Sequence, residues 1–247
     1  MMTIADILLV HGSWHGAWAW DDIAAELRER GHRVIAPDLL GLGGNVADLK
    51  PNIGLWEHVD QLETIVEEEN LSDLLLVGHS YGGALVHGLE ARIENRLRAV
   101  VHLEGAIPEP GSSIMSMWPE ERRQATLAAL KEVGDGWRVP PPNPSDWGGL
   151  NDKQIAWLAP KLTPQSVKTY RDKMPADLES ANCPHYYLYA RDRVPQPYAA
   201  VIERLSKARG WQFAATEGGH ELMITNPRAT LELIEIASER DRLPAEL

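Results

Sequence analysis

The stretch that most constrains the fold is residues 74–83, which read Leu-Leu-Leu-Val-Gly-His-Ser-Tyr-Gly-Gly. The four apolar residues predict a buried strand, and the residues that follow have helical spacing. Gly-x-Ser-x-Gly therefore falls at a strand-to-helix turn, where Gly78 and Gly82 avoid collisions with neighbouring backbone. This context predicts that Ser80 occupies a sharp, strained turn at a helix N-terminus, with its hydroxyl raised above the sheet as a nucleophile.

The rest of the chain alternates between short apolar runs and segments with helical spacing. Six runs are expected to be strands, at residues 7–10, 33–36, 74–77, 99–103, 186–189 and 212–215. Helical stripes are expected at residues 20–27, 55–66, 84–93 and 198–205, with a last helix opening at Asn226-Pro227. Such alternation predicts an α/β fold with a doubly wound, mostly parallel sheet of about six strands.

The alternation is interrupted after the fourth expected strand. Residues 105–182 contain ten of the 17 prolines and four of the nine tryptophans, and they show helical patterns but no strand run. The segment 139–144 carries four prolines and must be extended. We interpret residues 105–182 as a helical cap, or lid, inserted into a core domain formed by residues 1–104 and 183–247.

Composition limits the binding partners and the cellular compartment that we expect for this protein. Acidic residues outnumber basic ones by 36 to 24, and a net charge of −12 argues against binding to nucleic acid or to acidic membranes. The single cysteine, Cys183, excludes an intrachain disulfide and fits a reducing compartment. Export signals and membrane-length apolar runs are not evident, so we expect a cytoplasmic protein, as a monomer or a homodimer.

A serine nucleophile needs a base and an acid that orients it. His220 follows Gly218-Gly219 in the expected loop after the last strand, at the carboxyl edge of the sheet, so it is the predicted base. Asp192 follows the strand expected at 186–189 and completes the chain order Ser, Asp, His, so it is the predicted acid. The alternative is Glu104, which ends the preceding strand at the same edge.

The oxyanion formed on the substrate needs two backbone N–H donors. One is expected from Tyr81, directly after the nucleophile. The other is expected from the loop after the first strand, where Gly12 allows close approach of the backbone and Ser13 is the predicted donor. We expect no metal and no cofactor, because the chain lacks a His-Glu-x-x-His motif and one cysteine cannot build a thiolate cluster.

Four segments together resemble the α/β-hydrolase superfamily, and within it the small branch of plant methylesterases, salicylate-binding proteins, hydroxynitrile lyases and bacterial esterases. They are residues 9–18 (Leu-Val-His-Gly-Ser-Trp-His-Gly-Ala-Trp), 36–41, 77–83 and 219–222. The resemblance covers nearly the whole chain. It implies a triad of Ser80, His220 and Asp192, oxyanion donors at Ser13 and Tyr81, and a cap over the acyl and alcohol pockets.

Two positions bear on the reaction. Hydroxynitrile lyases of this branch carry a lysine after the catalytic histidine and a threonine at the first-loop glycine, whereas this chain has Glu221 and Gly12. An acidic Glu221 would repel a cyanide leaving group, which favours hydrolysis of a carboxylic ester. An acyl-homoserine lactonase or other lactonase, a hydroxynitrile lyase-like enzyme and a ligand-binding member of the fold stay open as alternatives.

The cap is nearly neutral, which suggests an apolar pocket for small or medium esters or lactones. Its candidate lining residues are Met115, Met117, Trp118, Trp137, Trp147 and Trp157. Each of them is also explained by packing of the cap onto the core, since Trp and Met are common core residues. Outside the cap, we expect Gly12, Glu104 and Met223 to border the same pocket.

Overall fold

The computed structural model describes residues 4–194 and 196–247, and its centre is one six-stranded sheet whose neighbouring strands are all parallel. In spatial order the strands are β2 (Arg33–Ile35), β1 (Asp6–Val10), β3 (Leu74–His79), β4 (Leu97–Leu103), β7 (His185–Ala190) and β8 (Trp211–Thr216). The prediction of a doubly wound sheet of about six strands is confirmed. Each strand lies within about two residues of the apolar run that predicted it.

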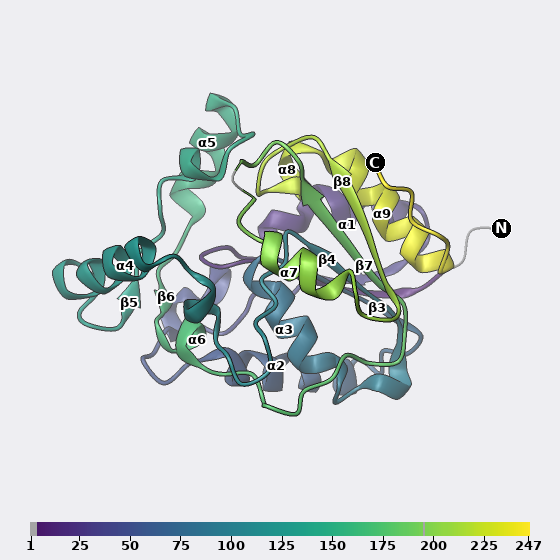
Figure 1. Ribbon diagram of the computed structural model, residues 1–247, viewed down its shortest axis with the longest axis horizontal. Helices are drawn as coiled ribbons and strands as arrows, with labels where there is room; N and C mark the ends of the chain where they lie inside the picture. The colour runs from purple at the N-terminus through teal and green to yellow at the C-terminus, as the bar shows by residue number, and fades with distance from the viewer. Residues whose placement is uncertain (1–3, 195) are drawn as a thin grey trace.

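Helices cover both faces of this sheet (Figure 1). One face carries α1 (Asp21–Glu29) and α9 (Pro227–Glu239), and the other carries α2 (Leu55–Glu68) and α3 (Tyr81–Glu90). Two shorter helices, α7 (Ala199–Leu205) and α8 (Leu222–Thr225), flank β8 along the chain. Within the described residues, no helix has both the length and the apolar character to cross a membrane.

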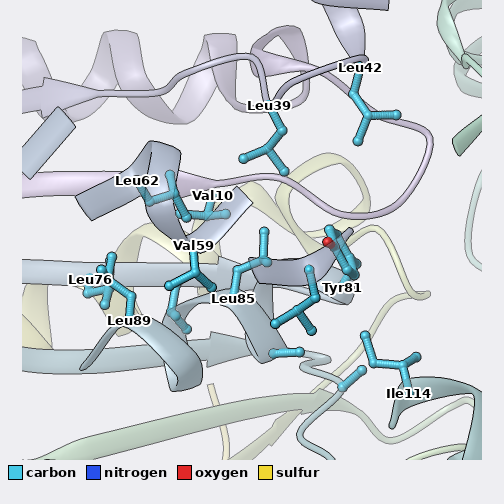
Figure 2. Close-up of a cluster of buried hydrophobic side chains, with 14 of the residues drawn as sticks. Val10, Leu39, Leu42, Val59, Leu62, Leu76, Tyr81, Leu85, Leu89 and Ile114 are labelled. Atoms are coloured by element: carbon cyan, nitrogen blue, oxygen red, sulfur yellow. The ribbon is translucent and has the colours of Figure 1, made fainter. Parts of the chain in front are cut away.

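The two cores follow from the alternation of side chains along each strand. In β3, Leu74 and Leu76 point into the core under α2 and α3, whereas Leu75 and Val77 point into the core under α1 and α9. Figure 2 shows the first core, where Leu76 lies among side chains of both helices. Because β3 is buried on both faces, its sequence is continuously apolar.

A long segment separates β4 from β7, in the part of the chain where the sequence analysis expects the insertion. Its helices are α4 (Glu120–Glu132), α5 (Asp152–Leu158) and α6 (Lys168–Arg171). Contrary to the expectation of helical patterns alone, β5 (Arg138–Val139) and β6 (Gln165–Ser166) form a small antiparallel pair. Two-residue strands are too short to give a periodic pattern, so the sequence could not indicate them. The insertion lies beyond the carboxyl ends of the core strands (Figure 1).

Short 3-10 helices complete the connections. Their bounds are Ala17–Trp20, Gly43–Asp48, Glu94–Arg96, Ile114–Met117, Pro144–Trp147 and Ala159–Lys161.

Candidate active site

Ser80 occupies the turn between β3 and α3 in a backbone conformation that L residues rarely adopt, with φ +52° and ψ −115°. Neither of the flanking glycines, Gly78 and Gly82, has room for a Cβ atom. A Cβ atom on Gly78 would lie 2.5 Å from the carbonyl oxygen of Gly82, and one on Gly82 would lie 2.5 Å from that of Val10. The turn therefore has the geometry that the Gly-x-Ser-x-Gly sequence predicted, and strain of this kind is typical of functional turns.

His220 meets this serine from the loop between β8 and α8. Its Nε2 lies 2.9 Å from the Ser80 Oγ, across 140 residues of sequence. The backbone of the histidine is held from two sides, because its N–H donates to the Trp147 carbonyl at 3.1 Å and its carbonyl lies 2.9 Å from Nε2 of His79. The predicted base thus contacts the predicted nucleophile.

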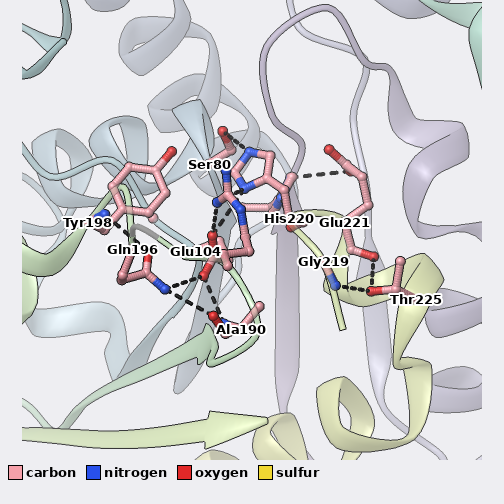
Figure 3. A network of polar contacts seen from close by, with 12 residues as sticks. Ser80, Glu104, Ala190, Gln196, Tyr198, Gly219, His220, Glu221 and Thr225 are labelled. Atoms are coloured by element: carbon pink, nitrogen blue, oxygen red, sulfur yellow. Dashed lines mark hydrogen bonds and ion pairs between the residues drawn. The ribbon is translucent and has the colours of Figure 1, made fainter. Parts of the chain in front are cut away.

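The carboxylate beside the other nitrogen of His220 belongs to Glu104, the residue after β4 (Figure 3). Its Oε2 lies 3.3 Å from the His220 Nδ1, and its Oε1 accepts a hydrogen bond from the Ala190 N–H at 2.8 Å. Arg193 forms an ion pair with the same carboxylate. Glu104 has no exposed surface, so each of these partners offsets the cost of burying a charge.

The structure contradicts the prediction that Asp192 is the acid. Asp192 is exposed, and its Oδ2 accepts a hydrogen bond from the Gly218 N–H at 3.2 Å. The turn after β7 carries this side chain outward, and the next residue, Arg193, points back toward His220 instead, with its Nη1 3.1 Å from Nδ1. The alternative named from the sequence, Glu104, occupies the orienting position.

Electrostatics keep Glu104 charged. Burial by itself would raise the pKa of this carboxyl, but His220, Arg193 and the Ala190 N–H together lower it below its usual value. A carboxylate at Nδ1 favours the tautomer in which Nδ1 carries the proton, and Nε2 is then free to accept the Ser80 proton. In that tautomer the protonated Nδ1 of His220 cannot accept a hydrogen bond from Arg193. The Arg193 guanidinium therefore donates to Glu104.

The two residues predicted as oxyanion donors lie at the cavity that contains Ser80. Ser13 and Tyr81 line the same cavity as Ser80 and His220. Tyr81 is the first residue of α3, where a helix N–H has no intrahelical acceptor. Gly12 provides the close approach expected of it, since a Cβ atom there would lie 2.8 Å from the His79 Nδ1.

A buried histidine and glutamate connect the loop of Ser13 with the loop of His220. Nδ1 of His15 lies 2.6 Å from the Ser13 carbonyl oxygen, and Nε2 of His15 lies 3.2 Å from Oε2 of Glu221. Both side chains are almost fully buried. Burial opposes both charges, yet Glu221 raises the pKa of His15 and His15 lowers that of Glu221, so the two form an ion pair.

Glu221 therefore does not have the role that the sequence suggested. It does not line the cavity and cannot act on a leaving group there. We call the His15–Glu221 pair the brace, because it joins the loop that carries Ser13 to the loop that carries His220.

A cavity of about 470 Å³ opens onto Ser80, and residues of the segment 105–182 form part of its wall. Its walls are mainly aromatic and apolar, and they include Trp14, Ile114, Met117, Trp118, Trp147, Tyr170 and Tyr198. Of the candidate lining residues, Met117, Trp118 and Trp147 line it. The others do not: Gly12, Glu104, Met115 and Trp137 lie outside the lining, and Met223 and Trp157 border a separate surface groove beside Trp18.

One cluster within the described residues has the spacing of a metal site. Ligand atoms of His79, His220 and Glu221 lie within 4.8 Å of one another. Both ring nitrogens of His220 already have polar partners in Ser80 and Glu104. A cation at this cluster would displace one of those contacts, so the arrangement favours the serine chemistry over metal binding.

Comparison with known families decides the class of the chain. Residues 7–233 match the model of the alpha/beta hydrolase family. The chain belongs to this family. Among curated members of the α/β-hydrolase family, the carbendazim hydrolyzing esterase of Nocardioides sp. (strain SG-4G) is 31% identical over 242 residues, which cover 93% of this chain and 98% of that protein. Methyl jasmonate esterase 1 of Vitis vinifera is 30% identical over 138 residues, covering 55% and 53%.

Solved α/β hydrolases share the fold over the whole chain. An extracellular α/β-hydrolase from a Paenibacillus species, described as sharing homology with tobacco salicylic acid binding protein 2, superimposes with a TM-score of 0.83. It is 23% identical, and the match covers 94% of this chain and 98% of that one. Tomato methylketone synthase I superimposes with a TM-score of 0.76 at 18% identity, over 96% and 98%. The expected resemblance to the small esterase branch is confirmed.

Within this α/β hydrolase, several cavity residues carried no signal in the sequence. Tyr170 and Tyr198 come from different segments, and the Tyr198 ring stacks beside His220 with centroids 6.1 Å apart. Arg122 and Arg193 also line the cavity. None belongs to a motif. Glu104, which lies outside the cavity lining, did have a signal, as a charged residue at the end of an expected strand.

Proposed function

We propose that this chain hydrolyses carboxylic esters, with Ser80 as nucleophile, His220 as base and Glu104 as the acid that orients the histidine. The observation that carries the proposal is the 2.9 Å contact between the Ser80 Oγ and the His220 Nε2 inside a cavity that Ser13 and Tyr81 also line. Esterases among the curated relatives support the same reaction class.

The geometry permits the two half-reactions of an acyl-enzyme mechanism. His220 takes the Ser80 proton as Oγ attacks the ester carbonyl, and the backbone N–H groups of Ser13 and Tyr81 stabilise the resulting oxyanion. His220 then gives that proton to the oxygen of the leaving alcohol, and an acyl group stays on Ser80. Water attacks the acyl group while His220 accepts its proton, which releases the acid and restores the serine. Glu104 stabilises the charged imidazole in both halves.

Small to medium esters are the substrates that the cavity suits. Its volume of about 470 Å³ and its aromatic walls favour an apolar body beside the scissile bond. We include methyl jasmonate and carbendazim in the test panel because proteins named for them are relatives of this chain. The same triad would open a lactone ring, and analysis of the products separates this reaction, since a lactone gives one hydroxy acid and no released alcohol.

The Ser80→Ala variant tests the proposal. We expect it to lower kcat/KM for p-nitrophenyl butyrate by at least about a thousandfold. In addition, paraoxon should label the wild-type chain at Ser80 with one diethylphosphoryl group, detected by mass spectrometry, and should leave the variant unlabelled. Retained Ser80-independent turnover would refute the assignment. Release of cyanide from mandelonitrile, without ester hydrolysis, would show a lyase.

A further inference from the structure

The charges that line the catalytic cavity differ in sign from those of the chain as a whole. The chain carries a net charge of −12, but the described residues that line the cavity include no Asp or Glu. Their formally charged side chains are Arg122 and Arg193. An acidic protein that exposes only positive side chains to its cavity provides an electrostatic preference for a negative group there.

The two arginines are not equivalent. Arg193 is paired with the buried Glu104, which neutralises it. Arg122, on α4, has no carboxylate at ion-pair distance among residues 4–194 and 196–247. Its guanidinium carbon lies 4.3 Å from the centroid of the Trp118 ring. The adjacent Arg123 pairs with Glu120 and does not line the cavity.

A second polar group in the same part of the cavity lacks a partner. Tyr170 is almost fully buried, and its ring centroid lies 4.9 Å from that of Trp118. The Tyr170 hydroxyl lies beside the Ser13 side chain but makes no hydrogen bond with any described residue. A buried hydroxyl without a partner is rare in folded proteins, and it calls for an explanation such as a ligand.

Arg122 acts on this end of the cavity. Burial raises the pKa of Tyr170 and of Tyr198, and the positive charge of Arg122 opposes that rise at both phenols. Arg122, Tyr170 and Tyr198 all line this cavity. Trp118 is close to both residues, since its ring centroid lies 4.3 Å from the Arg122 guanidinium carbon and 4.9 Å from the Tyr170 ring centroid, and it lines the same cavity.

We propose that Arg122 and Tyr170 form a subsite for a carboxylate carried by the substrate, so that the preferred substrate is a half-ester of a dicarboxylic acid. This inference rests on the proposed function and adds the substrate class. The guanidinium supplies an ion pair, and the Tyr170 hydroxyl donates a hydrogen bond, while Trp118 packs on the atoms that link the carboxylate to the ester.

Paired substrates of matched shape test the subsite. Monomethyl terephthalate is compared with methyl terephthalamate, and monomethyl adipate with methyl adipamate, so that each pair differs in one negative charge. We expect the wild-type chain to prefer the anionic member of at least one pair by about tenfold in kcat/KM. Arg122→Gln should reduce that preference to near one, chiefly through KM, and Arg122→Glu should reverse it. Arg123→Gln, on the same helix, should keep it.

A variant of Tyr170 tests whether its hydroxyl contributes to the carboxylate subsite. Tyr170→Phe removes one oxygen and keeps the ring, and it should lower the anionic preference by about fivefold. A wild-type preference at or below one in both pairs would overturn the subsite. So would a preference that survives both Arg122→Gln and Tyr170→Phe.

A binding measurement separates this proposal from the esterase proposal. Titration calorimetry on the Ser80→Ala protein compares terephthalate with its neutral diamide, and it needs no turnover. Tighter binding of terephthalate that is lost with Arg122→Glu supports the subsite even where the ester is not cleaved. Equal binding of the two compounds refutes the subsite, while Ser80-dependent hydrolysis of neutral esters would leave the esterase proposal intact.

Discussion

The carboxylate of Glu104 lies 3.3 Å from Nδ1 of His220, although the two residues are 116 positions apart in the sequence. Parallel strands make this contact possible, because β4 and β8 end at the same edge of the sheet with only β7 between them. Glu104 follows β4 in a left-handed conformation with φ +46°, which directs its side chain along this edge. The acid of the proposed triad therefore comes from a different strand end than the chain order suggested.

Loss of the negative charge should lower kcat strongly at Glu104 and leave kcat nearly unchanged at Asp192. Glu104→Gln keeps the shape of the side chain but no longer stabilises a charged His220, so we expect kcat to fall by about 10³- to 10⁴-fold. Asp192→Asn changes an exposed side chain and should keep kcat within about threefold. Steady-state kinetics with p-nitrophenyl butyrate measure both, and thermal unfolding confirms that each variant is folded. A large loss in Asp192→Asn with little effect in Glu104→Gln would restore the original assignment.

The brace should contribute to both stability and turnover. Glu221→Gln leaves His15 without its charged partner, and we expect the free energy of unfolding to fall by about 3 kcal/mol. Because His15 also holds the Ser13 carbonyl, kcat should fall while KM changes little. Glu90 provides a matched control, since it is equally buried and pairs with His185 at 2.6 Å outside the cavity.

Glu90→Gln should therefore destabilise the protein to a similar degree and retain kcat. Urea unfolding and steady-state kinetics are measured for the two variants side by side. Equal losses of kcat in both would show that the brace acts through stability alone.

Gly148 and Gly149 lie against Gly219, in the loop that carries His220. Gly148 and Gly149 have the same φ of +71°, a conformation that strains an alanine at either position. They differ in space: a Cβ atom on Gly149 would lie 2.3 Å from the Gly219 N, whereas one on Gly148 meets nothing within 4 Å. We expect Gly149→Ala to lower kcat at least about tenfold by displacing His220, and Gly148→Ala to cost about 1–3 kcal/mol of stability with kcat largely retained.

Comparing Gly148→Ala with Gly149→Ala separates the effect of backbone strain from the effect of displacing His220. Kinetics and urea unfolding are measured for both. Similar kinetic losses in the two variants would mean that backbone strain, and not contact with Gly219, explains the effect.

Buried neutral histidines should make the protein sensitive to acid. Burial lowers the pKa of His11 and His79 to about 3, that of His58 to about 4, and that of His102 well below its ordinary value. Below about pH 6.5 the unfolded chain binds protons at these positions and the folded chain does not, so stability falls as the pH falls. His15 has a raised pKa and acts in the opposite direction, but it is one histidine against four.

Each neutral histidine contributes a slope of up to about 1.4 kcal/mol per pH unit. The urea midpoint should therefore decrease steadily from pH 7 to pH 5 at constant ionic strength, and it should recover when the pH is raised again. A midpoint that stays constant or rises over this interval would contradict the neutral state of these residues.

Local patterns were sufficient to predict the strands of the central sheet and the turn that carries Ser80. The apolar run before Gly78 and the helical spacing after Gly82 placed Ser80 at a strand-to-helix turn, because the requirement for glycine at both positions is a short-range steric effect. The position of His220 also followed from chain order, since the loop after the last parallel strand must lie at the carboxyl edge of the sheet. Neither conclusion depends on how distant side chains pack.

Which carboxylate lies beside His220, and which residues line the cavity, were decided by the tertiary structure. Asp192 and Glu104 both follow strands that end at one edge, and the sequence could not show that the turn after β7 carries Asp192 into solvent. Likewise, Arg122 on α4 and Tyr170 on α6 line one cavity through contacts between segments far apart in the chain. Side-chain direction in a loop depends on what the loop packs against, and those contacts join residues far apart in the chain.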